Sequence, residues 1–152
     1  MFRQPILLAA AAGISVVLSA PSAFSQNAIA TADGESAGTR IEITELSRSS
    51  GGTVTMKFRL VNDSGENASP YELMGNYYHV GAVHLIDAFG KKKYLVITDS
   101  GGTCVCSNNL TTKLEPGKSL NLWARFPAPP AEVKEVSVIF PHFIPTDAPI
   151  SE

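Results

Sequence analysis

Charged residues are scarce in this sequence, and neither sign dominates. Of the 152 residues, 17% are charged, with 12 lysines and arginines against 14 acidic residues and a formal net charge of −2. The basic residues are spread along the chain and form no stripe of the kind that nucleic-acid-binding proteins present to phosphates. The length and the 44% hydrophobic content fit one globular domain. The composition therefore favours a single domain without a nucleic-acid partner.

Sequence motifs of catalysis are also missing. The chain has no Gly-x-Ser-x-Gly pattern, and no motif ties a particular serine to a particular histidine. The pair Gly101-Gly102 follows an apolar run but does not open a helix, which argues against a phosphate-binding loop. We therefore expect a protein that is not an enzyme, has no catalytic residues and needs no cofactor.

No apolar run reaches the ~20 residues that a membrane-spanning helix requires. The nearest is Pro5–Leu18, which follows a single arginine and precedes the small residues of Ala23-Phe24-Ser25. This order is typical of a secretory signal peptide. We predict a signal peptide over residues 1–25, with cleavage before Gln26 or, as second choice, after Ala30. The alternative is an uncleaved membrane anchor. The preferred interpretation is export to the periplasm or the extracellular space, without stable membrane insertion.

Strong amphipathic helices are absent as well, and short alternating runs take their place. In Thr53–Val61 the side chains of Val54, Met56, Phe58 and Leu60 fall on one face, which indicates a half-buried strand. The other expected strands are Arg40–Leu46, His79–Phe89, Tyr94–Thr98, Leu110–Leu114, Ser119–Phe126 and Val133–Phe140.

About seven short strands separated by turns indicate an all-β fold, an immunoglobulin-like antiparallel β-sandwich. This prediction uses strand number and alternation alone, since the Cys…Trp…Cys spacing of antibody domains is absent. We place the domain at residues 40–150, after a flexible leader over residues 26–39, and expect a hairpin between Val83–Asp87 and Lys93–Ile97. Residues 71–78 are expected to form a short helical turn that leads into extended chain, and residues 141–152 a proline-punctuated tail.

Cysteine is rare: the chain has only Cys104 and Cys106, separated by one residue. In fully extended chain their α-carbons would lie about 6.6 Å apart, toward the long end of disulfide geometry. Gly101-Gly102 before the pair and Ser107-Asn108-Asn109 after it allow the bend that a bridge needs. We predict a disulfide that rigidifies one loop. It would stabilise the domain by roughly 1.5 kcal/mol at best, because the closed loop is very short.

The alternatives for the cysteine pair are a redox couple and a soft-metal site. A redox couple needs an accessible thiol of low pKa, and the nearest lysines, Lys91–Lys93, lie at the far end of the preceding strand. A metal site could combine both cysteines with one of the three histidines, His79, His84 and His142. His79 and His84 are five residues apart in an expected strand, so they would point to opposite faces. Met56 is in phase with the apolar face and is expected in the core. We prefer the structural disulfide and predict no metal site.

Aromatic residues make up 8% of the chain, with a single tryptophan. Trp123 is out of phase with the apolar face of its strand, and Tyr77 and Tyr78 are adjacent in a turn-rich segment. Aromatic side chains are enriched where proteins meet their partners. We predict Tyr77, Tyr78 and Trp123 as a partner surface.

Several short motifs of this chain, taken together, resemble those of a bacterial envelope domain. They are Lys93–Ser100, Cys104–Ser107, Leu114–Gly117, Trp123–Pro130 and Asp147–Ile150. Over roughly residues 40–150 the chain is similar to an exported immunoglobulin-like module that occurs alone or ahead of an OmpA-type peptidoglycan-binding domain. The resemblance implies an immunoglobulin-like sandwich of the bacterial envelope and implies no catalytic residues. Since no OmpA-type domain is part of this sequence, we do not expect cell-wall anchoring by that route.

These observations together predict a non-catalytic exported protein that serves binding, adhesion or envelope maintenance. Its partner would be an envelope protein or a cell-wall component. The alternative is a periplasmic thiol-redox or copper-handling protein that uses Cys104 and Cys106.

Overall fold

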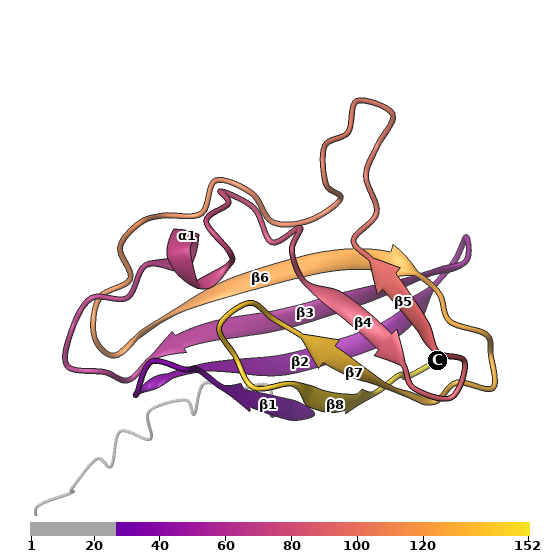
Figure 1. Cartoon of the computed structure of the whole chain (residues 1–152), viewed down its shortest axis with the longest axis horizontal. Coiled ribbons are helices and arrows are strands. Elements are labelled where there is room, and N and C mark those ends of the chain that lie inside the picture. Colours follow the sequence, from indigo (N-terminus) through magenta and orange to yellow (C-terminus); the bar gives the residue numbers. More distant parts are fainter. Residues whose placement is uncertain (1–26) are drawn as a thin grey trace, which may run out of the picture.

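The computed structural model describes residues 27–152, so the predicted signal peptide and the preferred cleavage site lie outside the described residues. The described chain forms eight strands and one helical turn, α1 (Pro70–Leu73). The strands make two sheets that face each other as two layers (Figure 1). No helix in residues 27–152 is long and apolar enough to span a membrane.

Both sheets are antiparallel and four-stranded, with the orders β1-β2-β3-β6 and β5-β4-β7-β8. The predicted all-β antiparallel sandwich is therefore confirmed, with eight strands instead of about seven. The strands of the first sheet are β1 (Ala30–Asp33), β2 (Thr39–Ser49), β3 (Thr53–Asn62) and β6 (Lys118–Pro127). Those of the second sheet are β4 (His84–Asp87), β5 (Lys92–Leu95), β7 (Glu135–Ile139) and β8 (Thr146–Pro149).

The core lies between the two layers, and β3 contributes the face that its alternation predicts. Val54, Met56 and Leu60 have no exposed surface, and Phe58 is 1% exposed. Phe58 packs edge-on against Phe140, which follows β7 in the opposite sheet, with ring centroids 5.0 Å apart. Burial of apolar surface of this kind is the dominant favourable contribution to folding. The Phe58–Phe140 contact joins the two layers.

Two strands lie where the sequence predicted none, and the expected strand Leu110–Leu114 is absent, since only Leu114 forms an isolated bridge there, with Ala68. β1 falls within residues 26–39, the predicted flexible leader, where it pairs with β2 and buries Ala32. β8 falls within residues 141–152, the predicted tail, where it pairs with β7 and buries Ala148. Each strand buries one alanine between more exposed neighbours, so its alternation is too weak to predict a strand. The prediction of a flexible leader is wrong, because the folded domain begins before residue 40.

The predicted hairpin is present, formed by β4 and β5. The buried carboxylate of Asp87 accepts hydrogen bonds from the backbone N–H groups of Phe89 and Gly90, at 3.0 Å each, which closes the turn. The strand expected from His79 begins only at His84, because residues 79–83 form a bent loop. This loop carries part of the candidate site.

The helical turn α1 lies in the connection between β3 and β4. Its first turn is capped by Ser69, whose hydroxyl accepts a hydrogen bond from the N–H of Glu72 at 3.3 Å. The left-handed backbone of Asn76, with φ 64°, then redirects the chain. This connection brings residues 77–81 to the cysteine segment.

The outward face of β2 and β3 carries a cluster of charged side chains. The Glu42 carboxylate bonds the guanidinium groups of Arg40, at 2.7 Å, and of Arg59. Burial alone would raise the pKa of Glu42, but the hydrogen bonds from the two arginines outweigh it and hold the pKa below its usual value. The ionised form of Glu42 therefore stabilises the fold.

Candidate functional site

The loop after β5 carries both cysteines. The backbone N–H of Ile97 donates to the carbonyl of Arg125 in β6 at 2.9 Å, and the chain then turns outward. At the turn that contains Gly101 and Gly102, the Asp99 carboxylate accepts hydrogen bonds from the N–H groups of Gly101 (2.8 Å) and Thr103 (3.0 Å). In Figure 1 this loop projects from the sandwich above β5 and β6. The Asp99 bonds fix the shape of its tip.

The returning limb of the loop lies along the edge of β6 that β3 does not use. The N–H of Arg125 donates to the carbonyl of Val105 at 3.1 Å, and the N–H of Ser107 donates to the carbonyl of Trp123 at 2.9 Å. The Ser107 hydroxyl accepts a hydrogen bond from the N–H of Trp123 at 2.9 Å. These bonds satisfy backbone groups of an edge strand, which are otherwise open to pairing with another chain. They also hold the backbone on both sides of Cys106.

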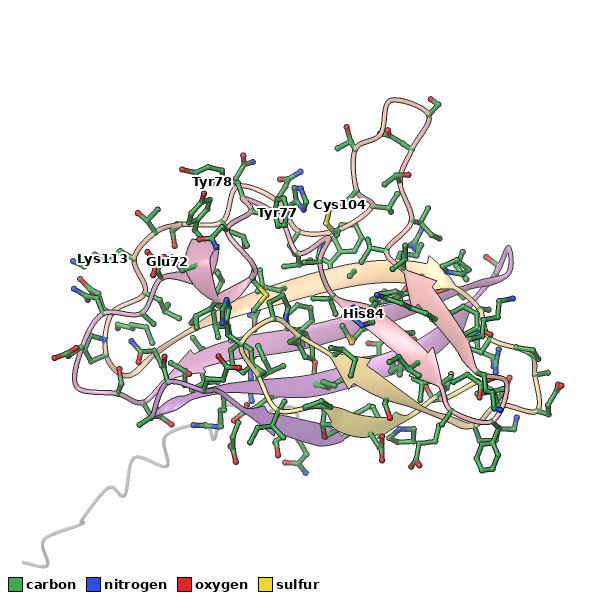
Figure 2. All side chains as sticks on the ribbon, viewed as in Figure 1. Glu72, Tyr77, Tyr78, His84, Cys104 and Lys113 are labelled. Carbon is green, nitrogen blue, oxygen red and sulfur yellow. A yellow bond between two sulfur atoms is a disulfide. The ribbon has the colours of Figure 1, made fainter. Side chains whose placement is uncertain are left out.

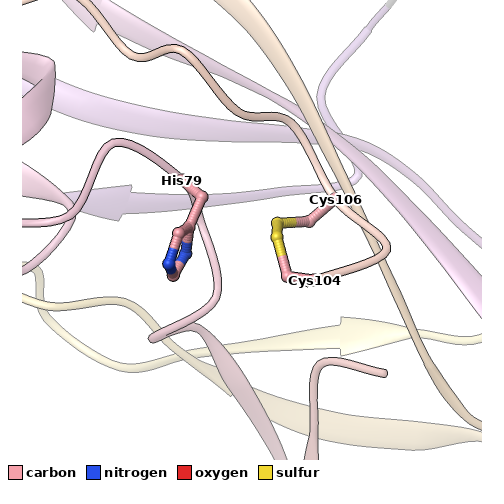
Figure 3. Close-up of side chains that lie close together, drawn as sticks. All are labelled: His79, Cys104 and Cys106. Carbon is pink, nitrogen blue, oxygen red and sulfur yellow. A yellow bond between two sulfur atoms is a disulfide. The ribbon is translucent and has the colours of Figure 1, made fainter. Parts of the chain in front are cut away.

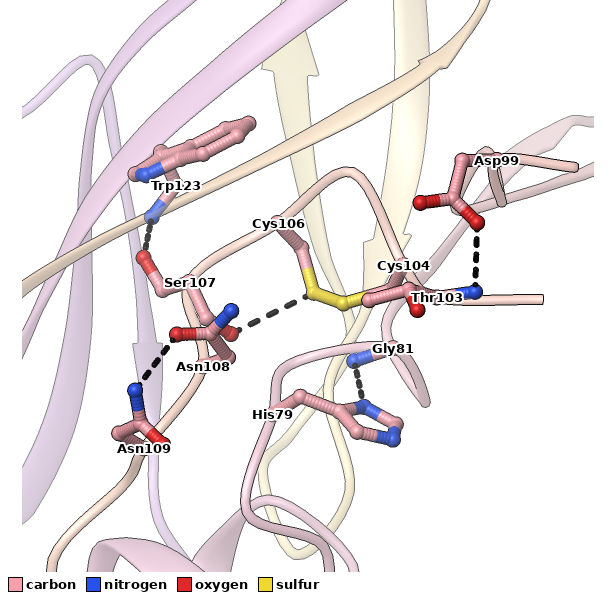
Figure 4. The surroundings of a disulfide bond; sticks show 10 residues. All are labelled: His79, Gly81, Asp99, Thr103, Cys104, Cys106, Ser107, Asn108, Asn109 and Trp123. Carbon is pink, nitrogen blue, oxygen red and sulfur yellow. Dashed lines mark hydrogen bonds between the residues drawn. A yellow bond between two sulfur atoms is a disulfide. The ribbon is translucent and has the colours of Figure 1, made fainter. Parts of the chain in front are cut away.

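Cys104 and Cys106 form a disulfide in the structure (Figure 4). Their α-carbons are 5.3 Å apart, closer than in extended chain, so the backbone bends between them, as a bridge between such close cysteines requires. Cys106 is 4% exposed, and its Sγ lies 3.4 Å from the carbonyl oxygen of Ser107. Cys104 is half-buried. One sulfur therefore faces the protein interior and the other is closer to solvent.

His79 lies beside the two cysteines (Figure 3). Its backbone pairs with Asn108 in an isolated bridge, and the neighbouring N–H of Val80 donates to the carbonyl of Ser107 at 3.1 Å. As a result, ligand atoms of His79, Cys104 and Cys106 all lie within 4.8 Å of one another. Among residues 27–152 this is the only group of three or more His, Cys, Asp or Glu side chains placed to share one metal ion.

One hydrogen bond fixes the ring of His79. Its Nδ1 accepts the backbone N–H of Gly81 at 3.0 Å (Figure 4). Nδ1 therefore carries no proton, and the neutral ring carries its proton on Nε2. A side chain at Gly81 would disturb this arrangement, because a Cβ there would lie 2.7 Å from Nδ1 and 3.7 Å from the Cβ of Cys104.

The other two histidines have different surroundings. His84, in β4, donates a hydrogen bond from Nδ1 to the carbonyl of Ala82 at 3.3 Å, and burial lowers the pKa of its ring below the ordinary value. His142 is exposed and lies 3.2 Å from the Glu35 carboxylate. The structure thus singles out His79 as the histidine next to the cysteine pair. Sequence spacing could not distinguish it, because the contact depends on the bridge to Asn108.

The tyrosines of the predicted partner surface lie next to this cluster. Tyr77 and Tyr78 are 51% and 59% exposed. The Tyr77 ring stacks on the His79 ring, with centroids 5.1 Å apart and planes 18° apart, and the Tyr78 ring contacts Tyr71 at 4.6 Å. We call Tyr71, Tyr77 and Tyr78 the tyrosine patch; Figure 2 shows Tyr77 and Tyr78 on the same side of the molecule as Cys104.

Trp123 is 40% exposed and points outward from β6, as its phase in the sequence indicates. It lies beside a shallow hollow that it shares with Lys57 of β3 and Asn121 of its own strand. The strand-like segment around Ser107 separates Trp123 from the loop that carries Tyr77 and Tyr78. The structure therefore brings the tyrosines together and sets Trp123 apart from them.

Comparison with known proteins assigns this chain to no family. No family model, no curated protein and no solved structure matches the chain.

Proposed function

We propose that this protein is a non-catalytic exported module that binds a partner of the bacterial envelope through the tyrosine patch. The observation that carries the proposal is the packing of two exposed rings on half-buried ones, Tyr77 on His79 and Tyr78 on Tyr71. Exposed tyrosines offer a large contact area with few rotatable bonds. Rings that already pack against a neighbour lose less conformational freedom when a partner binds.

The segment that follows the disulfide is hydrogen-bonded to the loop that carries this surface. The N–H of Leu110 donates to the carbonyl of Tyr78 at 3.0 Å, and the N–H of Val80 donates to Ser107. The chain on both sides of His79 is therefore bonded to the segment that follows Cys106. In this proposal the bridge between Cys104 and Cys106 is a local brace on a supporting segment that backbone hydrogen bonds already hold in place. An oxidising compartment outside the cytosol, which the signal-peptide prediction implies, favours such a bridge.

The proposal is tested by capture of partners from an envelope extract with the purified protein as bait. The test variant is Tyr77→Ser with Tyr78→Ser, and the control is Phe89→Ser, because Phe89 is 100% exposed in the turn between β4 and β5. We expect a specific partner to be lost from the double variant and kept by the control. Equal capture by all three proteins, or equal loss from both variants, would exclude the tyrosine patch as the binding surface.

A further inference from the structure

We infer that, once its disulfide is reduced, this protein binds Cu(I) between the thiolates of Cys104 and Cys106 and the imidazole of His79. The inference does not rest on the proposed partner-binding role, because none of its ligands is a tyrosine. It assigns a second property to the same end of the sandwich.

The three ligand atoms are already close to the separation that one ion requires. They lie within 4.8 Å of one another. Two ligands at about 2.0–2.3 Å from a three-coordinate metal, with an angle of about 120° between them, are about 3.5–4.0 Å apart. Reduction lets the two sulfurs move apart toward that distance, and the His79 ring needs a shift of only about 1 Å toward them. Side-chain rotation alone supplies movements of this size.

The backbone around the site does not depend on the S–S bond. Val105 is hydrogen-bonded on both sides, from its N–H to Ile97 at 2.7 Å and through its carbonyl to the N–H of Arg125. Ser107 is bonded to both Trp123 and Val80. These contacts remain when the bridge is opened, so the reduced cysteines stay beside His79. A site held in place before the metal arrives binds it with less loss of conformational freedom.

Opening the bridge consumes two electrons and two protons and yields two thiols. A phosphine supplies the electrons in vitro, taking an oxygen atom from water to become the phosphine oxide; a dithiol does so by becoming a disulfide itself. Cu(I) binding then displaces both thiol protons, because thiolate is the form that ligates metals. The disulfide form has no thiolate to offer, so metal binding is confined to the reduced protein.

Two thiolates and one imidazole determine which metal the site prefers. Thiolates are soft ligands that favour Cu(I), zinc and iron–sulfur clusters. Structural zinc sites almost always have four protein ligands, and here three side chains converge among the described residues. Methionine thioethers are also soft copper ligands. Met56 and Met74, however, have no exposed surface and lie in the core. Two thiolates and one imidazole therefore fit Cu(I) better than a structural zinc ion.

The hydrogen bond between the Gly81 N–H and His79 must break when His79 binds copper. The lone pair of Nδ1 is used by the N–H of Gly81 in the disulfide form. For His79 to ligate copper through Nδ1, this hydrogen bond must break. Ligation through Nε2 would move the ring proton to Nδ1, where it would face the same N–H. Either way, copper binding releases the Gly81 amide, which gives the site a spectroscopic signature independent of affinity.

The experiment uses purified protein reduced with a phosphine under argon and titrated with Cu(I) in competition with a coloured chelator. We expect one equivalent of Cu(I) to bind with ultraviolet thiolate–Cu(I) absorption, and none to bind to the disulfide form. Cys104→Ser and Cys106→Ser should each abolish binding. His79→Gln should weaken it by at least about tenfold, the lower end of the losses seen when even an outer partner of a metal ligand is removed. The amide resonance of Gly81 should shift on copper addition.

Two further variants keep the test decisive. Gly81→Ala should weaken binding through displacement of the His79 ring, since the added Cβ meets Nδ1 at 2.7 Å. His142→Asn is the control, because Asn tolerates the left-handed backbone of residue 142, and it should bind like the original protein. Thermal melting checks that each variant is folded. Failure of the reduced protein to bind, binding unchanged in His79→Gln, or tighter binding of zinc than of Cu(I) would overturn the inference.

Discussion

Replacing Phe58 with alanine should remove a contact that joins the two layers. The side chain is 1% exposed and packs edge-on against Phe140, which follows β7 of the opposite sheet, with ring centroids 5.0 Å apart. Phe→Ala substitutions at such sites cost about 3–5 kcal/mol, through lost apolar burial and the cavity left behind. Since small domains are stable by only about 5–15 kcal/mol, the loss is a large share of the total.

Urea denaturation followed by fluorescence measures this loss, and Trp123→Ala, followed by circular dichroism, is a matched aromatic control. Trp123 is on β6, next to β3 in the same sheet, but its side chain is 40% exposed on the outer face. We expect the control to change the free energy of unfolding by about 1 kcal/mol or less. A double-mutant cycle of Phe58→Ala with Phe140→Ala should show coupling of about 0.5–1.5 kcal/mol. A loss below about 1 kcal/mol for Phe58→Ala would refute the proposed core.

Three further predictions concern single features of the fold. Cys104→Ser combined with Cys106→Ser should leave the protein folded and lower its free energy of unfolding by roughly 1.5 kcal/mol at most, in urea titrations; complete unfolding would contradict a local brace. Asn62→Ala should cost about 1–3 kcal/mol, because the fully buried amide bonds two backbone carbonyls, at 2.8 Å each, and a cost near zero would show that these bonds are not made. Glu42 has a lowered pKa in the folded state, so it stabilises the fold at pH values above the pKa that Glu42 has in the unfolded chain. This stabilisation is lost as the pH falls from about 5. Glu42→Gln should therefore destabilise the protein at neutral pH and have less effect in acid, and an effect that is the same at both pH values would contradict this assignment.

The sequence predicted the parts of this fold whose side chains alternate strongly. β3 and the β4–β5 hairpin appear where expected, because apolar residues recur at every second position or flank a clear turn. β1 and β8 were not predicted, because each buries a single alanine and is held mainly by backbone hydrogen bonds to a longer neighbour. Pairing with a partner strand, which local periodicity does not report, decides the structure of such segments.

The candidate site could likewise be predicted only where local sequence determines the structure. The bend between Cys104 and Cys106 could be predicted from the glycine and asparagine residues that flank it. The position of His79 could not, because it depends on a backbone bridge to Asn108, 29 residues away along the chain. The exposure of Tyr77 and Tyr78 agrees with the prediction, but their packing on His79 and Tyr71 follows from the turn after α1.

Both proposals require a sandwich that stays folded while the cysteine cluster changes between the disulfide and the reduced state. Amide hydrogen exchange of the oxidised and the reduced protein, residue by residue, tests this requirement most directly. We expect protection in β2, β3, β6 and β7 to be the same in both states, with changes limited to residues 79–81 and 97–108. Loss of protection throughout both sheets on reduction would contradict this.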